Sequence, residues 1–449
     1  MASLPIDPQS NNGAPPEAAE PQRTALKHKD VRVALWPIMV VLYATLLPRE
    51  VRVTLGTFEI YADRIALLIV LPYVLRKLMQ GAIRFVLPDV LVLFAGVWMI
   101  GSMLAHYGLS PGLERGGSAA LDSTVGYFLA RISFRSLTDM RRALVLLLPG
   151  VTLVGAVIVF ESISHISFLR PLAAQIFGPL PLFEGGSAEA YRQNINEIRL
   201  GLYRARGPFE HAIHAGLFMA SLVGIYNLAG LRGYPRLFAN LVAPLAFFTV
   251  SSAAMLGLAL GYGLIAYEFV QRQVRELSWR LFILAGTVFI VVIELASNSG
   301  VIGLLSRYLT FDAQTAFYRQ LIWDFGSQTA LRNPLIGIGY ADYERPVWMV
   351  SNSVDAHWLL LALRDGIPCS LSLLAASVIA LIGLSRASAK VPRADQLFYR
   401  GIAISLFVLI ISMFTVYLWG GVAMWFTVIL GACVACSQRS YKAIKVEVT

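Results

Sequence analysis

Ionisable side chains gather in two polar stretches of a chain that is otherwise strongly apolar. Residues 204–214 and residues 319–365 each combine arginine with histidine in a segment broken by glycine and proline. The groups singled out there as able to bind anions or move protons are Arg204, Arg206, His211, His214, Arg319, Arg332, Arg345, Asp355, His357 and Arg364. Because arginine grips phosphate oxygens in pairs and neutral histidine accepts protons, the stretches suggest two halves of one active site. His211 and His214, one helical turn apart, are expected either to line one cavity or to pack at the membrane interface.

The histidine of the second stretch has the most suggestive position. His357 opens an apolar run at residues 357–384, and Ser353 or Asp355 is placed to cap the helix that this run predicts. The positive end of a helix disfavours imidazolium, so a neutral His357 is expected to act there as a general base for a hydroxyl group. The alternative is a structural histidine at the membrane surface.

Two arginines of the first stretch come just before a predicted helix. Arg204 and Arg206 precede Pro208, and proline is tolerated in the first turn of a helix. The N-terminus of a helix favours anions, so these arginines are candidates to bind phosphate beside it. Alternatively, they anchor the helix or pair with Glu197 and Glu210.

The apolar composition indicates a membrane protein. The 449 residues are 57% hydrophobic and 14% charged, against about 25% charged in soluble domains. Apolar runs of about 20 residues, long enough to cross a hydrocarbon core, recur along the chain. About twelve helical spans are predicted, at residues 32–48, 60–76, 85–105, 117–133, 142–164, 210–230, 237–251, 253–271, 281–297, 357–384, 398–418 and 420–437. The expected fold class is an all-α, polytopic integral membrane protein.

Positive charge in the loops predicts the orientation. The net charge of +10 is explained by loop arginines and lysines, so nucleic acid is not an expected partner. With these loops inside, both termini are cytoplasmic: a disordered tail at residues 1–30, a transmembrane domain at 31–437 and a short tail at 438–449. Two larger loops, about 165–209 and 298–356, then lie on the outer face and carry the polar stretches.

The sequence predicts no metal or cofactor site. The three cysteines lie in apolar runs without partners at zinc-ligand spacing. The glycines of residues 257–263 lie in an apolar helix, where helix packing explains them better than nucleotide binding. Asp122 and Glu161 lie in or near spans and are interpreted either as functional groups or as interhelical pairs.

Three parts of the chain resemble motifs of the O-antigen ligase and O-antigen polymerase superfamily, which includes exopolysaccharide polymerases. They are RARGPFEHAIHAG (204–216), RQLIWDF (319–325), and NPLIGIGY with DAHWLLLALRDGIP (333–340 and 355–368). They are similar to the family's Arg-x-x-Gly-x-Phe, Arg-x-x-x-Trp, Pro-x-x-Gly-x-Gly and histidine elements. Trp358 stands where the family often has asparagine, and HAIHAG replaces a common Pro-Asn. These departures bear on the substrate more than on the chemistry.

The resemblance implies a GT-C-like fold and a metal-independent, inverting glycosyl transfer on the periplasmic side of the bacterial inner membrane. The donor would be a glycan on undecaprenyl diphosphate, and the acceptor a lipid-linked glycan or lipid A–core. His357 would be catalytic as the general base, and Arg204 or Arg206 with Arg319 would bind the diphosphate. Supporting roles would fall to Asp355, His211, His214, Arg364 and Arg332. Polysaccharide-assembly proteins would be further partners, and no cofactor is implied.

Two other classes of function remain open at this point. A lipid-linked glycan transporter, or flippase, would also be polytopic, although no repeat between the two halves is visible in the sequence. A structural subunit of an envelope polysaccharide complex gives no reason for arginine and histidine to gather in two outer loops. The transferase is therefore the leading hypothesis.

Overall fold

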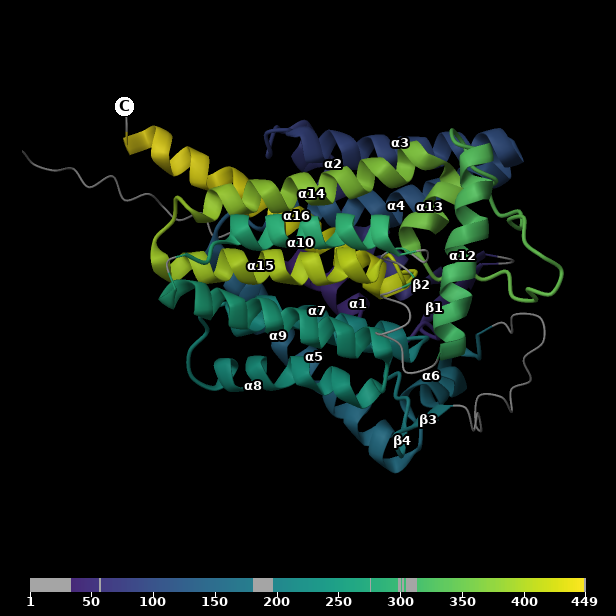
Figure 1. Cartoon of the computed structure of the whole chain (residues 1–449), viewed down its shortest axis with the longest axis horizontal. Coiled ribbons are helices and arrows are strands. Elements are labelled where there is room, and N and C mark those ends of the chain that lie inside the picture. The colour runs from purple at the N-terminus through teal and green to yellow at the C-terminus, as the bar shows by residue number, and fades with distance from the viewer. Residues whose placement is uncertain are drawn as a thin grey trace, which may run out of the picture. The chain divides into compact units, whose positions relative to one another are not determined.

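The computed structural model describes residues 34–447, except for 56–57, 181–196, 275, 298–299, 301–302 and 304–312. This part of the chain is mostly helical (Figure 1). Seven helices in it are long and apolar enough to cross a membrane: α3 (Leu87–Tyr107), α5 (Leu137–Ser164), α9 (Ser252–Gln273), α10 (Trp279–Ala296), α14 (Ile367–Ser388), α15 (Arg393–Ser412) and α16 (Gly420–Glu447). The prediction of an all-α, multi-pass membrane protein is confirmed at this level. The predicted N-terminal tail lies outside the described residues, and α16 runs through most of the predicted C-terminal tail.

The other five predicted spans are also helical, but they are shorter or more polar. They are α1 (Trp36–Ala44), α2 (Ala62–Met79), α4 (Leu109–Ser133), α7 (Ala212–Asn227), and α8 (Tyr234–Val242) with the 3-10 helix η3 (Ala243–Thr249). The last of these breaks at Pro244, which has no backbone N–H to continue the α-helical ladder. Charged residues within α2 and α4 lower their mean hydropathy.

The helices of the core approach one another closely. In Figure 1, α14 and α15 run side by side with α16, and α16 packs against α4, α14 and α15. Helix α7 packs against α9 and α15, where Gly224 faces Gly401. A Cβ atom on either glycine would overlap the other's carbonyl oxygen. Small residues therefore permit this crossing, as is typical of membrane helices.

The two predicted outer loops contain regular structure. The first includes α6 (Leu169–Phe177) and a short antiparallel hairpin, β3 (Ile198–Arg199) with β4 (Leu202–Tyr203). Much of the second is α12 (Ala313–Arg332), which lies across the direction of α14 and α15 (Figure 1). A further unpredicted hairpin pairs β1 (Arg52–Leu55) with β2 (Phe58–Tyr61).

The span predicted at residues 357–384 is divided into two helices. Helix α13 (His357–Asp365) ends at Gly366, and α14 begins at Ile367. Gly366 has φ 90°, and a Cβ atom there would overlap the carbonyl of Leu335. Only glycine fits this conformation without strain, so the chain turns between two helices instead of continuing as one.

The NPLIGIGY segment holds the end of α13. The N–H of Ile338 donates to the carbonyl of Leu363 at 2.6 Å, and the N–H of Gly339 donates to Arg364 at 3.1 Å. The indole of Trp98 on α3 donates to the carbonyl of Asp365 at 2.9 Å. These bonds satisfy carbonyls that a helix end leaves unpaired. The glycine-rich motif thus approaches protein backbone, and it fixes the helix that carries the candidate histidine.

Candidate active site

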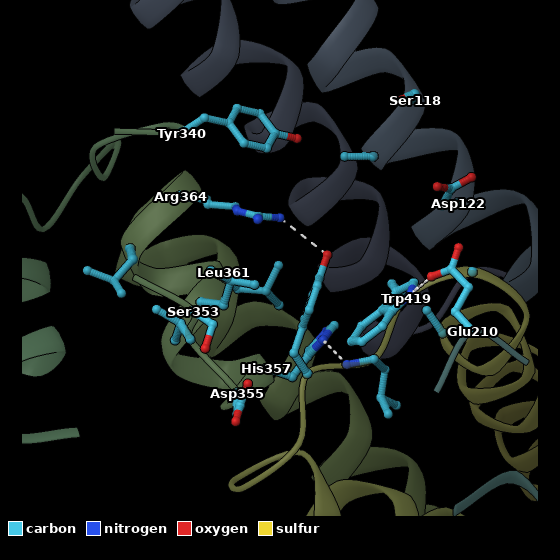
Figure 2. Close-up of a pocket in the computed structure, with 18 of the residues that line it drawn as sticks. Ser118, Asp122, Glu210, Tyr340, Ser353, Asp355, His357, Leu361, Arg364 and Trp419 are labelled. Carbon is cyan, nitrogen blue, oxygen red and sulfur yellow. Dashed lines mark hydrogen bonds between the residues drawn. The ribbon is translucent and has the colours of Figure 1, made fainter. Parts of the chain in front are cut away.

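A cavity of about 1210 Å³ brings parts of the two polar stretches together (Figure 2). The predicted site residues in its wall are Arg206, His211, Asp355, His357 and Arg364. The predicted residues outside the wall are Arg204, His214, Arg319 and Arg332. The rest of the wall comes mainly from α2, α4, residues 338–343 and residues 417–420.

His357 is the first residue of α13, which is the position that the sequence predicts. The predicted cap is wrong. Ala356 is the N-cap, no side chain caps the helix, and neither Ser353 nor Asp355 takes that role. The backbone N–H of His357 instead donates to the carbonyl of Met413 at 2.8 Å. The first backbone N–H of α13 is therefore satisfied by a carbonyl that is distant in sequence, and no local side chain is needed.

Two contacts fix the imidazole of His357. It stacks on Tyr417, with ring centroids 5.5 Å and planes 22° apart. Its Nδ1 accepts a hydrogen bond from the backbone N–H of Leu418 at 3.3 Å (Figure 2). Burial and the charge of Arg364 lower the pKa of His357 to about 3, so the ring is neutral at physiological pH. Because Nδ1 offers its lone pair to Leu418, the ring proton is on Nε2.

Asp355 lies in the cavity wall two residues before His357, where solvent reaches it. Its carboxylate has no hydrogen-bond or ion-pair partner among the described residues. Neighbouring protein atoms reduce the hydration of this carboxylate and so raise the pKa of Asp355, and the charge of Arg319 opposes that rise. The carboxylate is therefore a proton acceptor that no described protein donor occupies.

Arg204 and Arg319 are poorly solvated, and the positive charge of Arg199 acts on both. Arg319 is only 8% exposed. The Nε atoms of Arg204 and Arg319 are buried without a hydrogen-bond partner among the described residues. Desolvation, then the charge of Arg199, lowers the pKa of Arg204 to about 10. Desolvation also lowers the pKa of Arg319, against the opposing charge of Asp355. Cations in this condition are stabilised by an incoming anion.

The turn that carries Arg204 and Arg206 is held by Glu161 of α5. The backbone N–H groups of Gly207 and Arg206 donate to one carboxylate oxygen of Glu161 at 2.9 and 3.3 Å. The side chain of Arg206 forms an ion pair with Glu197. The pairing alternative therefore applies to Arg206, whose charge is compensated, whereas Arg204 has no ion-pair partner among the described residues.

The two histidines of the first stretch have different surroundings. His211 lines the cavity and caps α7, because its Nδ1 accepts from the N–H of Ile213 at 3.2 Å. Burial and the charge of Arg204 lower the pKa of His211 to about 3. His214 is buried, and its Nε2 lies 2.8 Å from the carbonyl oxygen of Tyr417, to which it donates. Only His211 faces the cavity, and His214 supports the segment that carries Tyr417.

The remaining candidate arginines occupy opposite environments. Arg364 lies in the cavity wall, with its guanidinium 4.7 Å from the ring centre of Tyr340 and 5.4 Å from that of Tyr417. It also donates to the Tyr417 hydroxyl at 3.2 Å (Figure 2). The side chain of Arg332 is 61% exposed and pairs with Glu344. The structure thus places Arg364 in the site and Arg332 on the surface.

Part of the wall was missed by sequence reasoning. Arg64 of α2 grips both carboxylate oxygens of Asp122 on α4, with a shortest distance of 2.8 Å. Arg49 pairs with Glu210 at 3.1 Å, and the indole of Trp419 donates to the same carboxylate. Asp122 therefore forms an ion pair between two helices, which was one of the two alternatives expected from the sequence. A Tyr-Leu-Trp-Gly-Gly break between the last two apolar runs was the available signal for the tryptophan.

No protein-family model matches the chain, and no curated protein matches it. Within the part of the chain that the structure describes, no group of three or more His, Cys, Asp and Glu residues is arranged to hold a metal ion. The function is therefore argued from the chemistry of the cavity and its neighbouring arginines.

Proposed function

We propose that this protein transfers a glycan from undecaprenyl diphosphate to an acceptor hydroxyl, as a polysaccharide polymerase or an O-antigen ligase. The observation that carries the proposal is that arginines whose buried Nε has no described hydrogen-bond partner interact electrostatically with a proton-transfer group of the cavity wall. Arg319 interacts with Asp355 of the cavity wall, and the charge of Arg199 acts on both Arg319 and Arg204. His357 lies in the same wall.

The cations suit the difficult part of this reaction. As the bond from the sugar to the diphosphate breaks, the leaving group gains a negative charge. Fixed donors aimed at that charge lower the barrier, and they act most strongly where water is scarce. Arg204 and Arg319 lie outside the cavity wall, but each has a buried Nε without a described hydrogen-bond partner, so each has a donor available for a diphosphate that reaches them.

The cavity suits a glycan in size and in wall chemistry. Its 1210 Å³ exceed the roughly 300–1,000 Å³ of common small-molecule sites, which fits a substrate of several sugar rings. Aromatic rings of Tyr61, Tyr340 and Trp419 lie in the wall together with carboxylates such as Asp122. Rings can cover the apolar faces of sugars, and carboxylates can accept their hydroxyl hydrogens.

The motif resemblance adds the finer features of the proposal. The fold is GT-C-like with about twelve membrane crossings, both termini are cytoplasmic, and the cavity opens to the periplasmic side of the inner membrane. The transfer inverts the anomeric configuration and is metal-independent. The acceptor is another lipid-linked glycan or lipid A–core, and polysaccharide-assembly proteins are its partners.

Envelope glycan analysis of a deletion strain tests the function. The strain is complemented with the wild-type gene, His357→Ala or Arg319→Ala, and Arg332→Ala serves as the matched control because Arg332 is exposed. We expect wild type and Arg332→Ala to restore the glycan, and the other two variants to fail while still being inserted. Full restoration by both His357→Ala and Arg319→Ala would overturn the proposal.

The glycans left in the deletion strain identify the reaction. Single repeat units on the lipid carrier or on lipid A indicate a polymerase. Full-length polymer that stays on its carrier indicates a ligase. Lipid-linked units trapped on the inner leaflet would contradict the transferase and indicate a transporter.

A further inference from the structure

The carboxylates of the cavity differ in one respect. Six of the seven accept a hydrogen bond or an ion pair from a described residue: Asp63, Asp122, Glu197, Glu210, Asp342 and Asp365. Asp355 is the seventh, and it accepts none from the part of the chain that is described. Its oxygens are thus free to accept a proton or a hydrogen bond from a ligand in the cavity.

The imidazole of His357, two residues later, differs from Asp355 because one of its nitrogens is already engaged in a hydrogen bond. The backbone N–H of Leu418 can only donate, so the bond of 3.3 Å requires a lone pair on Nδ1 of His357. A neutral imidazole then carries its hydrogen on Nε2. In the other tautomer, the Nδ1–H of His357 would face the backbone N–H of Leu418, which costs about as much free energy as a lost hydrogen bond. The nitrogen left for a cavity ligand is therefore a donor.

Resting on the proposed function, we infer that Asp355 is the base that takes the acceptor proton, and that His357 donates through Nε2–H to the anionic leaving group. This reverses the role that the sequence alone suggests for the histidine. The charge on the diphosphate makes such a hydrogen bond stronger than one between neutral groups. Asp355, two residues before this helix begins, supplies the lone pair that His357 lacks.

The reaction balances with these two groups. The acceptor oxygen forms a bond to the anomeric carbon while its proton passes to a carboxylate oxygen of Asp355. The bond from the anomeric carbon to the phosphate oxygen breaks, and its electron pair stays on that oxygen. The products are the glycosylated acceptor and undecaprenyl diphosphate with one more negative charge. Water then removes the proton from Asp355, which restores the carboxylate.

The tautomer can be measured without substrate. Protein with ¹⁵N-labelled histidine is placed in lipid nanodiscs, and the His357 ring signals are assigned by their loss in His357→Gln. We expect a protonated Nε2 and an unprotonated Nδ1 that do not change between about pH 5 and pH 8. A protonated Nδ1, or a charged ring at neutral pH, would overturn the inference.

Binding of undecaprenyl diphosphate separates the two roles. Loss of a donor to a charged group weakens binding about tenfold or more, so His357→Ala should show that loss and His357→Gln, which keeps an N–H, should recover part of it. Asp355→Asn should bind undecaprenyl diphosphate as tightly as wild type or more tightly, because it removes a negative charge near the phosphates. Weaker binding in Asp355→Asn than in His357→Ala would contradict the assignment.

Turnover completes the test. Membranes of the deletion strain carry the native donor and acceptor, and release of undecaprenyl diphosphate after adding purified protein reports the reaction. Loss of a general base slows a reaction about 10²- to 10⁴-fold, so we expect this range for Asp355→Asn, with part of the rate restored by Asp355→Glu. Glu344→Gln is the matched control, since this carboxylate is exposed on a nearby loop. Wild-type turnover in Asp355→Asn would overturn the base role alone, whereas wild-type protein that binds no undecaprenyl diphosphate would overturn the function as well.

Discussion

The phenol ring of Tyr417 lies against the imidazole of His357, with centroids 5.5 Å and planes 22° apart. The same tyrosine accepts a hydrogen bond from Arg364 through its hydroxyl and one from His214 through its carbonyl. A single residue from the C-terminal part of the chain therefore orients three side chains that the sequence singles out.

Removing this ring should reduce turnover more than removing its hydroxyl. Tyr417→Phe keeps the stack and loses the bond from Arg364, whereas Tyr417→Ala loses both. An aromatic stack contributes about 0.5–1.5 kcal/mol. We therefore expect the rate of undecaprenyl diphosphate release to be several-fold lower for Tyr417→Ala than for Tyr417→Phe. Equal rates in the two variants would show that the stack does not orient His357.

Arg319 should be needed for binding of the lipid diphosphate. A hydrogen bond to a charged group contributes about 1.5–3 kcal/mol, so Arg319→Ala should bind undecaprenyl diphosphate at least about tenfold more weakly. Arg319→Lys keeps the charge without the planar fork and should be intermediate. Arg332→Ala should bind as wild type does, because Arg332 is exposed and pairs with Glu344. An Arg319→Ala variant with wild-type affinity would remove this residue from the site.

Gly366 should not tolerate a side chain. Its φ of 90° and the adjacent carbonyl of Leu335 make Gly366→Ala unfavourable by ~2–4 kcal/mol. We expect a lower melting temperature for the purified variant in detergent. Gly263→Ala in α9 is the control, because a Cβ atom there has no atom within 4 Å. A Gly366→Ala protein as stable as this control would contradict the account of the break between α13 and α14.

The pH profile should lack an imidazole limb near neutrality. The pKa of His357 is lowered to about 3 by burial and by Arg364, with His214 adding to the effect. A lowered pKa keeps the ring neutral on both sides of its usual value, so activity should not change with its titration between about pH 5 and pH 8.

Activity should instead fall on the acid side. The pKa of Asp355 is raised by desolvation against the charge of Arg319, and a base loses its function as pH falls through its pKa. Turnover of wild type and of Asp355→Glu, measured against pH in deletion-strain membranes, checks both statements. A limb near pH 6.5 that His357→Gln abolishes would contradict them.

The multi-pass helical architecture was predictable because the length and composition of each apolar run are enough to show that it can cross a hydrocarbon core. The start of α13 at His357 was predictable for the same local reason. The break at Gly366 was not, because the carbonyl that excludes a side chain belongs to Leu335, which is distant in sequence. Local patterns indicate which residues favour a helix, but not which other segment approaches it.

The site residues show the same limit. Charge and residue type marked out Arg204 and Arg319, yet the pairing that neutralises Arg206 and leaves Arg204 without an ion-pair partner among the described residues depends on tertiary contacts. The tautomer of His357 depends on the backbone N–H of Leu418. Nearly every residue has such a group, so the residue type at position 418 gives no indication of this contact. The segment around Trp419 was overlooked because it contains few charged groups.

The bonds from the segment 413–418 to His357 also have a consequence for biosynthesis. The carbonyl of Met413 accepts the backbone N–H of His357, and the N–H of Leu418 fixes the position of the ring proton. The ribosome makes this segment after all the other described cavity residues except Trp419, Gly420 and Ala423. A nascent chain still lacking this segment holds a histidine without its orienting contacts. The candidate site is therefore complete only after this segment has been synthesised, and we expect chains that stop before it to be inactive.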